Sequence, residues 1–196
     1  MSIKKVLKIS VCGSSAVGKS SIGCRLADKE PYPEHVSTIG VDFFIKHLPL
    51  YGAKINIWDL AGDSRFQSIT YSYVKGSDIL ILVYDMSRRS SIRELREIHD
   101  AYKKNKIPEI RSIVVGNKSD KGNNCMNRGI NFAFQLGAPH ITVSAKDNTG
   151  FDQLLDTILS LAQVEPYLQL DPIPEVEVNY VNINDIMRSC NRCVIV

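Results

Sequence analysis

Short runs of apolar residues alternate along the chain with segments whose apolar positions repeat at helical spacing. The apolar runs are bounded by polar or turn-forming residues, as is typical of strands at the centre of a parallel sheet. We expect strands at residues 6–12, 41–50, 54–59, 79–84, 112–115 and 140–143, a hairpin turn at 51–53, and helices at 19–27, 90–104, 127–136 and 151–162. Because strands and helices alternate, the pattern predicts an α/β domain.

Composition excludes several classes of protein. The chain has 196 residues, of which 44% are hydrophobic and 23% charged, so collagen-like and wholly disordered chains are excluded. A net charge of +3 without a Lys/Arg cluster argues against nucleic-acid binding. The longest apolar run, residues 79–84, is far shorter than the roughly 20 residues of a membrane-spanning helix, and the first residues do not resemble a secretory signal. Five cysteines, an odd number, are expected to be free thiols in a reducing compartment.

The chain changes character near residue 164. The segment 165–196 contains three prolines, and its five acidic and two basic residues give it a charge of −3. Since the net charge of the whole chain is +3, residues 1–164 carry a charge of +6. We therefore expect one globular domain over residues 1–164 and a flexible acidic tail over residues 165–196.

Residues 13–20 read Gly-Ser-Ser-Ala-Val-Gly-Lys-Ser, which fits the pattern G-x-x-x-x-G-K-[ST] between a predicted strand and a predicted helix. Backbone N–H groups of such a loop cradle phosphate oxygens at the positive end of the helix. Lys19 would reach the β and γ phosphates, and the Ser20 hydroxyl would bind Mg²⁺. The expected phosphate-contacting residues are Gly13, Ser15, Ala16, Val17, Gly18, Lys19, Ser20 and Ser21. The pattern does not by itself distinguish ATP from GTP, or a kinase from a hydrolase.

A second motif also follows a predicted strand. Asp59 and Gly62 form D-x-x-G, where the carboxylate can hold Mg²⁺ through water and the glycine N–H can approach a γ-phosphate. D-x-x-G alone is weak, because it also occurs as an ordinary turn at the end of a strand.

Residues expected to recognise the base follow the next strands. The segment Asn117-Lys118-Ser119-Asp120 ends in a carboxylate that can accept hydrogen bonds from N1–H and N2–H₂ of guanine, a donor pair that adenine lacks. Ser144, Ala145 and Lys146 form a second loop on the base side. Asp120, together with the lack of a lid segment, disfavours a P-loop kinase or ATPase.

In this order the motifs resemble the small GTPases of the Ras superfamily, and specifically the Rab family. The resemblance covers residues 5–164 and implies a P-loop NTPase fold with a six-stranded, mostly parallel sheet and about five helices. It also implies a monomeric, GTP-hydrolysing GTP/GDP switch with Mg²⁺ in vesicle transport, cycling between the cytosol and the cytoplasmic face of intracellular membranes. The residues typical of the Rab family are Ile39-Gly40-Val41-Asp42-Phe43, Trp58-Asp59, Ala61-Gly62, Arg65-Phe66, Ser68-Ile69-Thr70, Tyr73 and Gly76.

The same resemblance assigns further roles. Thr38 would bind Mg²⁺ only when the γ-phosphate is present, and Tyr32 would flank the guanine or the ribose. Phe43, Trp58 and Tyr73 would form an exposed aromatic triad that contacts effectors, although ordinary packing would explain these aromatic residues as well. The other implied partners are an exchange factor, a GTPase-activating protein and a prenyl-binding escort protein.

The chain departs from the family where catalysis is concerned. Lys19 and Gly62 match, but Asp63 stands where Rab proteins carry the glutamine that orients the attacking water. An ionised aspartate cannot donate and brings negative charge towards the γ-phosphate, so we expect hydrolysis slowed by roughly tenfold or more. The alternatives are that a partner supplies the missing groups, or that the protein is a GTP-binding module with negligible GTPase activity. Ala16, at a position that is commonly glycine, and His35, near a position where a tyrosine is expected, are smaller departures.

The last residues suggest a lipid anchor. Cys193-Val194-Ile195-Val196 matches the prenylation pattern C-a-a-X, although valine is an unusual final residue. One lipid chain binds membranes only marginally and the tail is acidic, so Cys190 is the candidate for a second modification. A zinc site at this C-x-x-C pair is disfavoured, because no second pair or histidine accompanies it.

Overall fold

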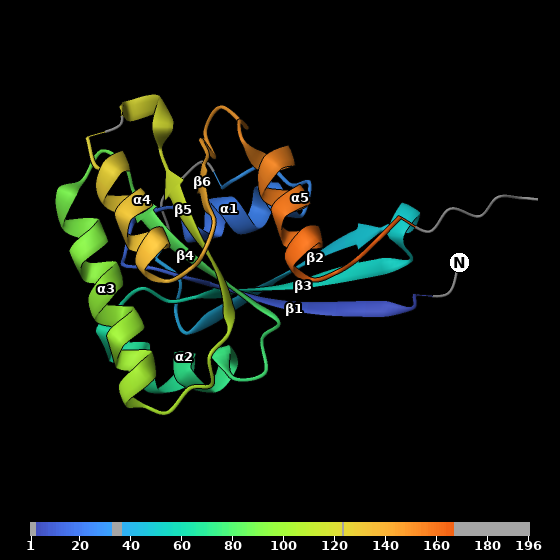
Figure 1. The fold of residues 1–196 in the computed structure, drawn as a ribbon, viewed down its shortest axis with the longest axis horizontal. Helices are drawn as coiled ribbons and strands as arrows, with labels where there is room; N and C mark the ends of the chain where they lie inside the picture. The colour runs from blue at the N-terminus through green and yellow to red at the C-terminus, as the bar shows by residue number, and fades with distance from the viewer. Residues whose placement is uncertain (1–2, 33–36, 123, 167–196) are drawn as a thin grey trace, which may run out of the picture.

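The computed structural model describes residues 3–32, 37–122 and 124–166, which fold as a twisted sheet with helices on both faces (Figure 1). The strands lie in the order β2-β3-β1-β4-β5-β6; only β2 and β3 pair antiparallel. Within these residues the architecture confirms the expected mostly parallel sheet of six strands with five α-helices. The strands are β1 (Lys5–Cys12), β2 (Val41–Leu48), β3 (Ala53–Leu60), β4 (Ile79–Asp85), β5 (Arg111–Asn117) and β6 (His140–Thr142). The helices are α1 (Lys19–Leu26), α2 (Gln67–Val74), α3 (Arg89–Lys104), α4 (Met126–Gln135) and α5 (Phe151–Leu161).

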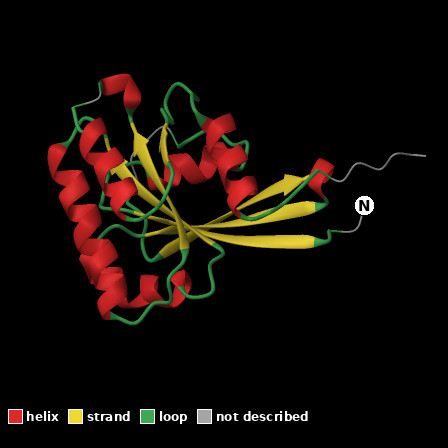
Figure 2. Cartoon of the chain, in the orientation of Figure 1, coloured by secondary structure: helices red, strands yellow, loops and turns green. Residues whose placement is uncertain are grey.

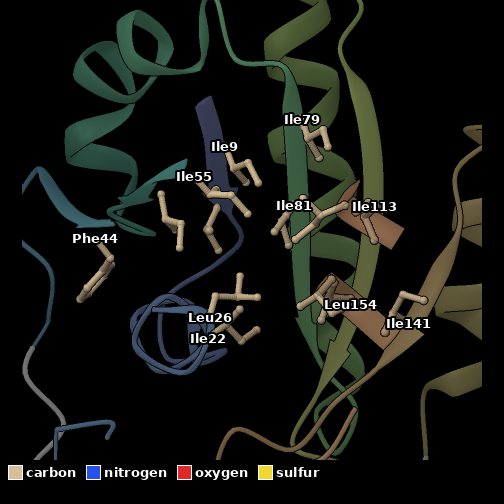
Figure 3. Packing of buried hydrophobic residues seen from close by; sticks show 14 of the residues in the cluster. Ile9, Ile22, Leu26, Phe44, Ile55, Ile79, Ile81, Ile113, Ile141 and Leu154 are labelled. Atoms are coloured by element: carbon tan, nitrogen blue, oxygen red, sulfur yellow. The ribbon is translucent and has the colours of Figure 1, made fainter. Parts of the chain in front are cut away.

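Helices cover both faces of the sheet (Figure 2), and the buried apolar side chains form two clusters, one on each face. Side chains alternate along a strand, so Ile79 and Ile81 of β4 face α1 and α5, while Leu80 and Leu82 face the opposite layer. Figure 3 shows the first layer, in which Ile22, Leu26 and Leu154 of the helices pack against Ile9, Ile55, Ile113 and Ile141 of the strands. Helices α2, α3 and α4 cover the second layer through Val74, Leu95, Tyr102, Phe132 and Ala133.

Two expectations about elements were wrong. The strand expected to reach residue 50 ends at Leu48, because Pro49 has no N–H for the ladder and begins a short 3₁₀ turn, Pro49–Tyr51. Gly52, with φ of 54°, then reverses the chain into β3. The apolar pattern gave no helix at α2, which buries only Thr70 and Val74 and so has a weak helical signature.

The free-thiol and membrane expectations are partly tested by the described residues. Cys12, Cys24 and Cys125 are buried free thiols, whereas Cys190 and Cys193 lie outside the described residues, as does the tail from residue 167 onward. None of the helices in the described part of the chain is both long and apolar enough to cross a bilayer.

Candidate nucleotide-binding site

The predicted motifs meet at one edge of the sheet. Strands β1, β3, β4, β5 and β6 run in the same direction, so the loops that follow them lie at the same edge. Residues 13–18 follow β1, Gly62 follows β3, residues 118–120 follow β5 and residues 144–146 follow β6. This is the edge at which open α/β sheets bind ligands.

The phosphate loop has close contacts that require glycine. A Cβ at Gly18 would lie 2.3 Å from Nδ2 of Asn117, and a Cβ at Gly13 would lie 2.3 Å from the carbonyl oxygen of Val83. Gly18 also adopts φ of 95°, in the left-handed region. Ala16 holds φ of 63°, so the alanine found where glycine is common keeps a backbone conformation that L-residues rarely adopt.

Asn117 and Lys118 hold the phosphate loop in place. Asn117 Nδ2 donates to the carbonyl oxygen of Val17 at 2.9 Å, and Lys118 Nζ donates to that of Ala16 at 2.6 Å. Lys118 also pairs with Asp85 at 2.9 Å. The two residues that sequence reasoning assigned to the base therefore also shape the phosphate cradle.

Lys19 lies under the loop with its ammonium group directed back towards it. Its Nζ donates to the carbonyl oxygen of Ser14 at 3.0 Å, and only 6% of the residue is exposed. Burial lowers the pKa of this ammonium group, and the nearby Asp59 carboxylate opposes that effect. A Cβ at Gly62 would lie 2.6 Å from Lys19 Nζ, so the glycine of D-x-x-G packs directly against the lysine.

The three residues expected to bind Mg²⁺ converge. Ser20 Oγ donates to Oδ2 of Asp59 at 2.6 Å, Thr38 Oγ1 donates to the same oxygen at 3.2 Å, and the two hydroxyls lie 3.1 Å apart. Asp59 is fully buried, and its Oδ1 has no hydrogen-bond partner among the described residues. Burial raises the pKa of this carboxyl group.

An orphaned buried carboxylate oxygen beside two hydroxyls fits a hard divalent cation, which prefers oxygen ligands. Two hydroxyls and one carboxylate, the latter acting directly or through water, do not complete the shell of such a cation, so phosphate and water oxygens would supply the rest. The described part of the chain contains no group of three or more His, Cys, Asp or Glu residues that could hold a metal ion.

A cavity of about 300 Å³ opens between the phosphate loop and residues 37–39 and 62–66. Tyr32, 63% exposed, lines a neighbouring cavity of about 350 Å³ with Ser20 and Thr38. Ser15 is exposed and Ser21 half-buried in the first turn of α1. Residues 33–36, including His35, lie outside the described residues.

The base-side loops are tied together. Ser144 Oγ donates to Oδ1 of Asp120 at 2.9 Å and so orients the carboxylate, and the Ala145 N–H donates to Oδ1 of Asn117 at 3.2 Å. Arg25 of α1 donates to the carbonyl oxygens of Ala145 and Lys146 at 2.9 and 3.3 Å. Asp120 is exposed in this structure, and a base bound at this loop would cover it.

Two arginines of the site were missed by sequence reasoning. Besides Arg25, Arg88 reaches the phosphate loop from the start of α3, donating to Ser14 Oγ and to the Ser15 carbonyl oxygen, both at 3.2 Å, while Glu94 accepts from its other nitrogen at 3.0 Å. Neither arginine belongs to a motif, and the Arg88 contacts span more than 70 residues of sequence. No local pattern could have found them.

Asp63 does not present a free carboxylate. Its Oδ2 accepts from Nε and Nη2 of Arg65 at 3.0 and 2.6 Å, and its Oδ1 accepts from the Arg65 main-chain N–H at 2.9 Å. These hydrogen bonds hold the pKa of the Asp63 carboxyl group below its usual range. The negative charge of Asp63, which we expected to approach the γ-phosphate, is therefore paired with the Arg65 guanidinium in this structure.

The aromatic residues expected to form a triad do meet. The ring of Trp58 lies 4.7 Å from that of Phe43 and 5.0 Å from that of Tyr73, measured between centroids. Phe43 is 39% exposed, whereas Trp58 and Tyr73 are half-buried and pack against the second core layer. The cluster is therefore both a packing element and a partly exposed surface.

The chain is similar in sequence to known proteins over this whole site. The profile of the Ras family matches residues 8–163, which include all the motifs described above. The chain is 39% identical over 151 residues to Ras-related protein Rab-1D of Dictyostelium discoideum, covering 74% of each chain. It is 39% identical over 165 residues to Ras-related protein Rab-18-B of Danio rerio, covering 78% of this chain and 79% of that one. Identity to Ras-related protein SEC4 of Saccharomyces cerevisiae is 32% over 166 residues, covering 83% and 77%.

Proposed function

Because the chain belongs to the Rab family of Ras-superfamily small GTPases, we propose that it is a GTP/GDP switch in intracellular vesicle transport. The observation that carries the proposal is the convergence of Ser20 and Thr38 on Asp59 beside the phosphate cavity, with one buried carboxylate oxygen left for a cation. These three residues would hold Mg²⁺, which when bound neutralises charge on the phosphates.

The bound nucleotide would be GTP or GDP. The phosphate loop and Lys19 bind the phosphates, while Asp120, oriented by Ser144, recognises guanine. Thr38 and Gly62 both line the phosphate cavity. A third phosphate would contact both at once, so its presence or absence selects the conformation of residues 37–43 and 62–74.

The partners would read that conformation. Phe43, Trp58 and Tyr73 link β2, β3 and α2 into one surface next to the site, which suits effectors that distinguish the two nucleotide states. An exchange factor and a GTPase-activating protein complete the cycle, and the protein itself acts as a monomer.

Membrane attachment would come from lipid. Prenylation of Cys193, with Cys190 carrying a second modification, would place the protein on the cytoplasmic face of intracellular membranes. A prenyl-binding escort protein would return it to the cytosol.

We further propose that intrinsic GTP hydrolysis is slow because of Asp63. The Asp63 carboxylate, which accepts from Arg65 in this structure, has no N–H to donate, so it cannot replace the amide of a glutamine in orienting water. We expect the Asp63→Gln variant to hydrolyse GTP roughly tenfold faster or more. The glutamine carboxamide is neutral and offers both a donor and an acceptor with which to orient the attacking water. Single-turnover phosphate release from purified, GTP-loaded protein measures this.

Asp156→Gln makes the same replacement at an exposed position of α5 and should leave the rate unchanged. Equal rates for the wild type and Asp63→Gln would refute the role given to Asp63. If neither protein hydrolyses GTP although both bind it, the alternative of a GTP-binding regulatory or scaffold module is favoured.

A further inference from the structure

Asp63 and Arg65 form an ion pair at the wall of the phosphate cavity. Both residues line the same cavity of about 300 Å³ as Lys19, Ser20 and Thr38. The Arg65 side chain is 79% exposed and that of Asp63 is 37% exposed. Arg65 is therefore a cavity-lining residue with a largely exposed side chain, whose guanidinium also lies 5.9 Å from the centroid of the Phe66 ring.

The hydrogen bonds of the pair divide into a fixed and an exchangeable part. The Arg65 main-chain N–H donates to Asp63 Oδ1, which caps the 3₁₀ turn Ser64–Phe66. Nε and Nη2 of Arg65 both donate to the other oxygen, Oδ2. The side-chain contact can break while the main-chain contact keeps the turn in place.

A terminal phosphate would compete for the guanidinium. Exposed ion pairs contribute little net stability because water solvates both partners. A γ-phosphate carries more negative charge than one carboxylate, and guanidinium groups bind phosphate oxygens in a planar, bidentate fashion. The exchange would bring a positive group to the terminal phosphate, while Asp63 Oδ1 keeps the hydrogen bond from the Arg65 main-chain N–H.

We propose that Arg65 is a γ-phosphate-binding residue of this protein. With a diphosphate bound, its guanidinium stays on Oδ2 of Asp63; with a triphosphate bound, it transfers to an oxygen of the γ-phosphate. Asp63 is then a positioning residue, which keeps Arg65 at the cavity until the third phosphate arrives. The proposal rests on the guanine-nucleotide switch proposed above and adds the group that senses the third phosphate.

The test compares affinities for GDP and for a non-hydrolysable GTP analogue, both with Mg²⁺. Arg65→Gln alone is ambiguous, because it also leaves the Asp63 charge without a partner. The decisive measurement therefore uses the Asp63→Asn background, in which there is no carboxylate to neutralise. There, adding Arg65→Gln should lower the preference for the GTP analogue over GDP roughly tenfold, the effect of one charge-assisted hydrogen bond, with GDP affinity unchanged.

Arg93 provides the matched control. Its side chain is 76% exposed on α3, close to the value for Arg65, but it pairs with Glu97 and is not among the residues lining the cavity. Arg93→Gln should leave the preference unchanged. If Asp63→Asn folds poorly, Asp63→Ser keeps an acceptor for the cap of the turn and replaces it as background.

An unchanged preference on adding Arg65→Gln to Asp63→Asn would overturn the proposal, since it would mean that Arg65 only neutralises Asp63. A loss of preference equal to that caused by Arg93→Gln would also overturn it. Failure of the wild type to bind either guanine nucleotide would instead refute the proposed function.

Discussion

The Asp120→Asn variant should lose most of its affinity for GDP and GTP, roughly a thousandfold or more, and should gain affinity for xanthosine nucleotides. The carboxylate accepts two hydrogen bonds from the N1–H and N2–H₂ groups of guanine. A carboxamide offers one acceptor and one donor, so its N–H₂ faces the guanine amino group without an acceptor. Sites built on hydrogen bonds to a substrate lose several orders of magnitude when one partner is mismatched. Xanthine carries a carbonyl at that position and restores the match.

The measurement is a competition of GDP and xanthosine diphosphate against a fluorescent nucleotide, with wild type and variant side by side. Ser144 Oγ can also donate to the Asn side-chain oxygen, so the loop should keep its geometry. Asp147→Asn, an exposed replacement in the neighbouring loop, serves as the control and should bind as the wild type does. Unchanged GDP affinity in Asp120→Asn would remove Asp120 from base recognition.

The second large effect is expected at the phosphate end of the site. Lys19→Met should weaken binding of GDP and of a GTP analogue by roughly a hundredfold or more, because charge-assisted hydrogen bonds to the phosphates are lost. The folded protein should survive the change. Methionine fills the space of the buried alkyl chain, and removal of an ammonium group whose pKa is lowered by burial offsets the lost hydrogen bond to the Ser14 carbonyl.

Nucleotide titration and thermal unfolding together separate these effects. We expect the unfolding midpoint of the nucleotide-free variant to stay near that of the nucleotide-free wild type, while the stabilisation by added GDP disappears. Lys104→Met, at an exposed position near the end of α3, should change neither quantity. If GDP raises the unfolding midpoint of Lys19→Met at the same concentrations at which it stabilises the wild type, Lys19 does not contribute to phosphate binding.

Much of the fold could be predicted because the pattern of the central strands is unambiguous. All seven residues of β4 are buried, so its apolar run could be assigned to the middle of a parallel sheet. Helix α2 could not be predicted from periodicity, since most of its residues are not buried. The end of β2 was placed too late because Pro49 carries a side chain that suits an apolar run but lacks the N–H that a strand needs.

The site divides in the same way. Lys19, Asp59 and Asp120 could be predicted, because each belongs to a motif that follows a strand. The end of that strand determines where the residue lies. Arg25 and Arg88 could not, because their partners are backbone carbonyls and hydroxyls of distant loops. The pairing of Asp63 with Arg65 depends on the rotamers of two exposed side chains two residues apart, and a sequence pattern does not specify them.

A third phosphate should change the conformation around the site, and Trp58 can report this change directly. It is the only tryptophan of the chain, and its ring contacts Phe43 and Tyr73, which belong to the two segments expected to switch, residues 37–43 and 62–74. The emission of Trp58 should change when Mg²⁺-GDP is replaced by Mg²⁺ and a non-hydrolysable GTP analogue, and should return when GDP is restored. Identical spectra in the two states, with exchange verified by analysis of the bound nucleotide, would contradict a conformational change on binding of the third phosphate.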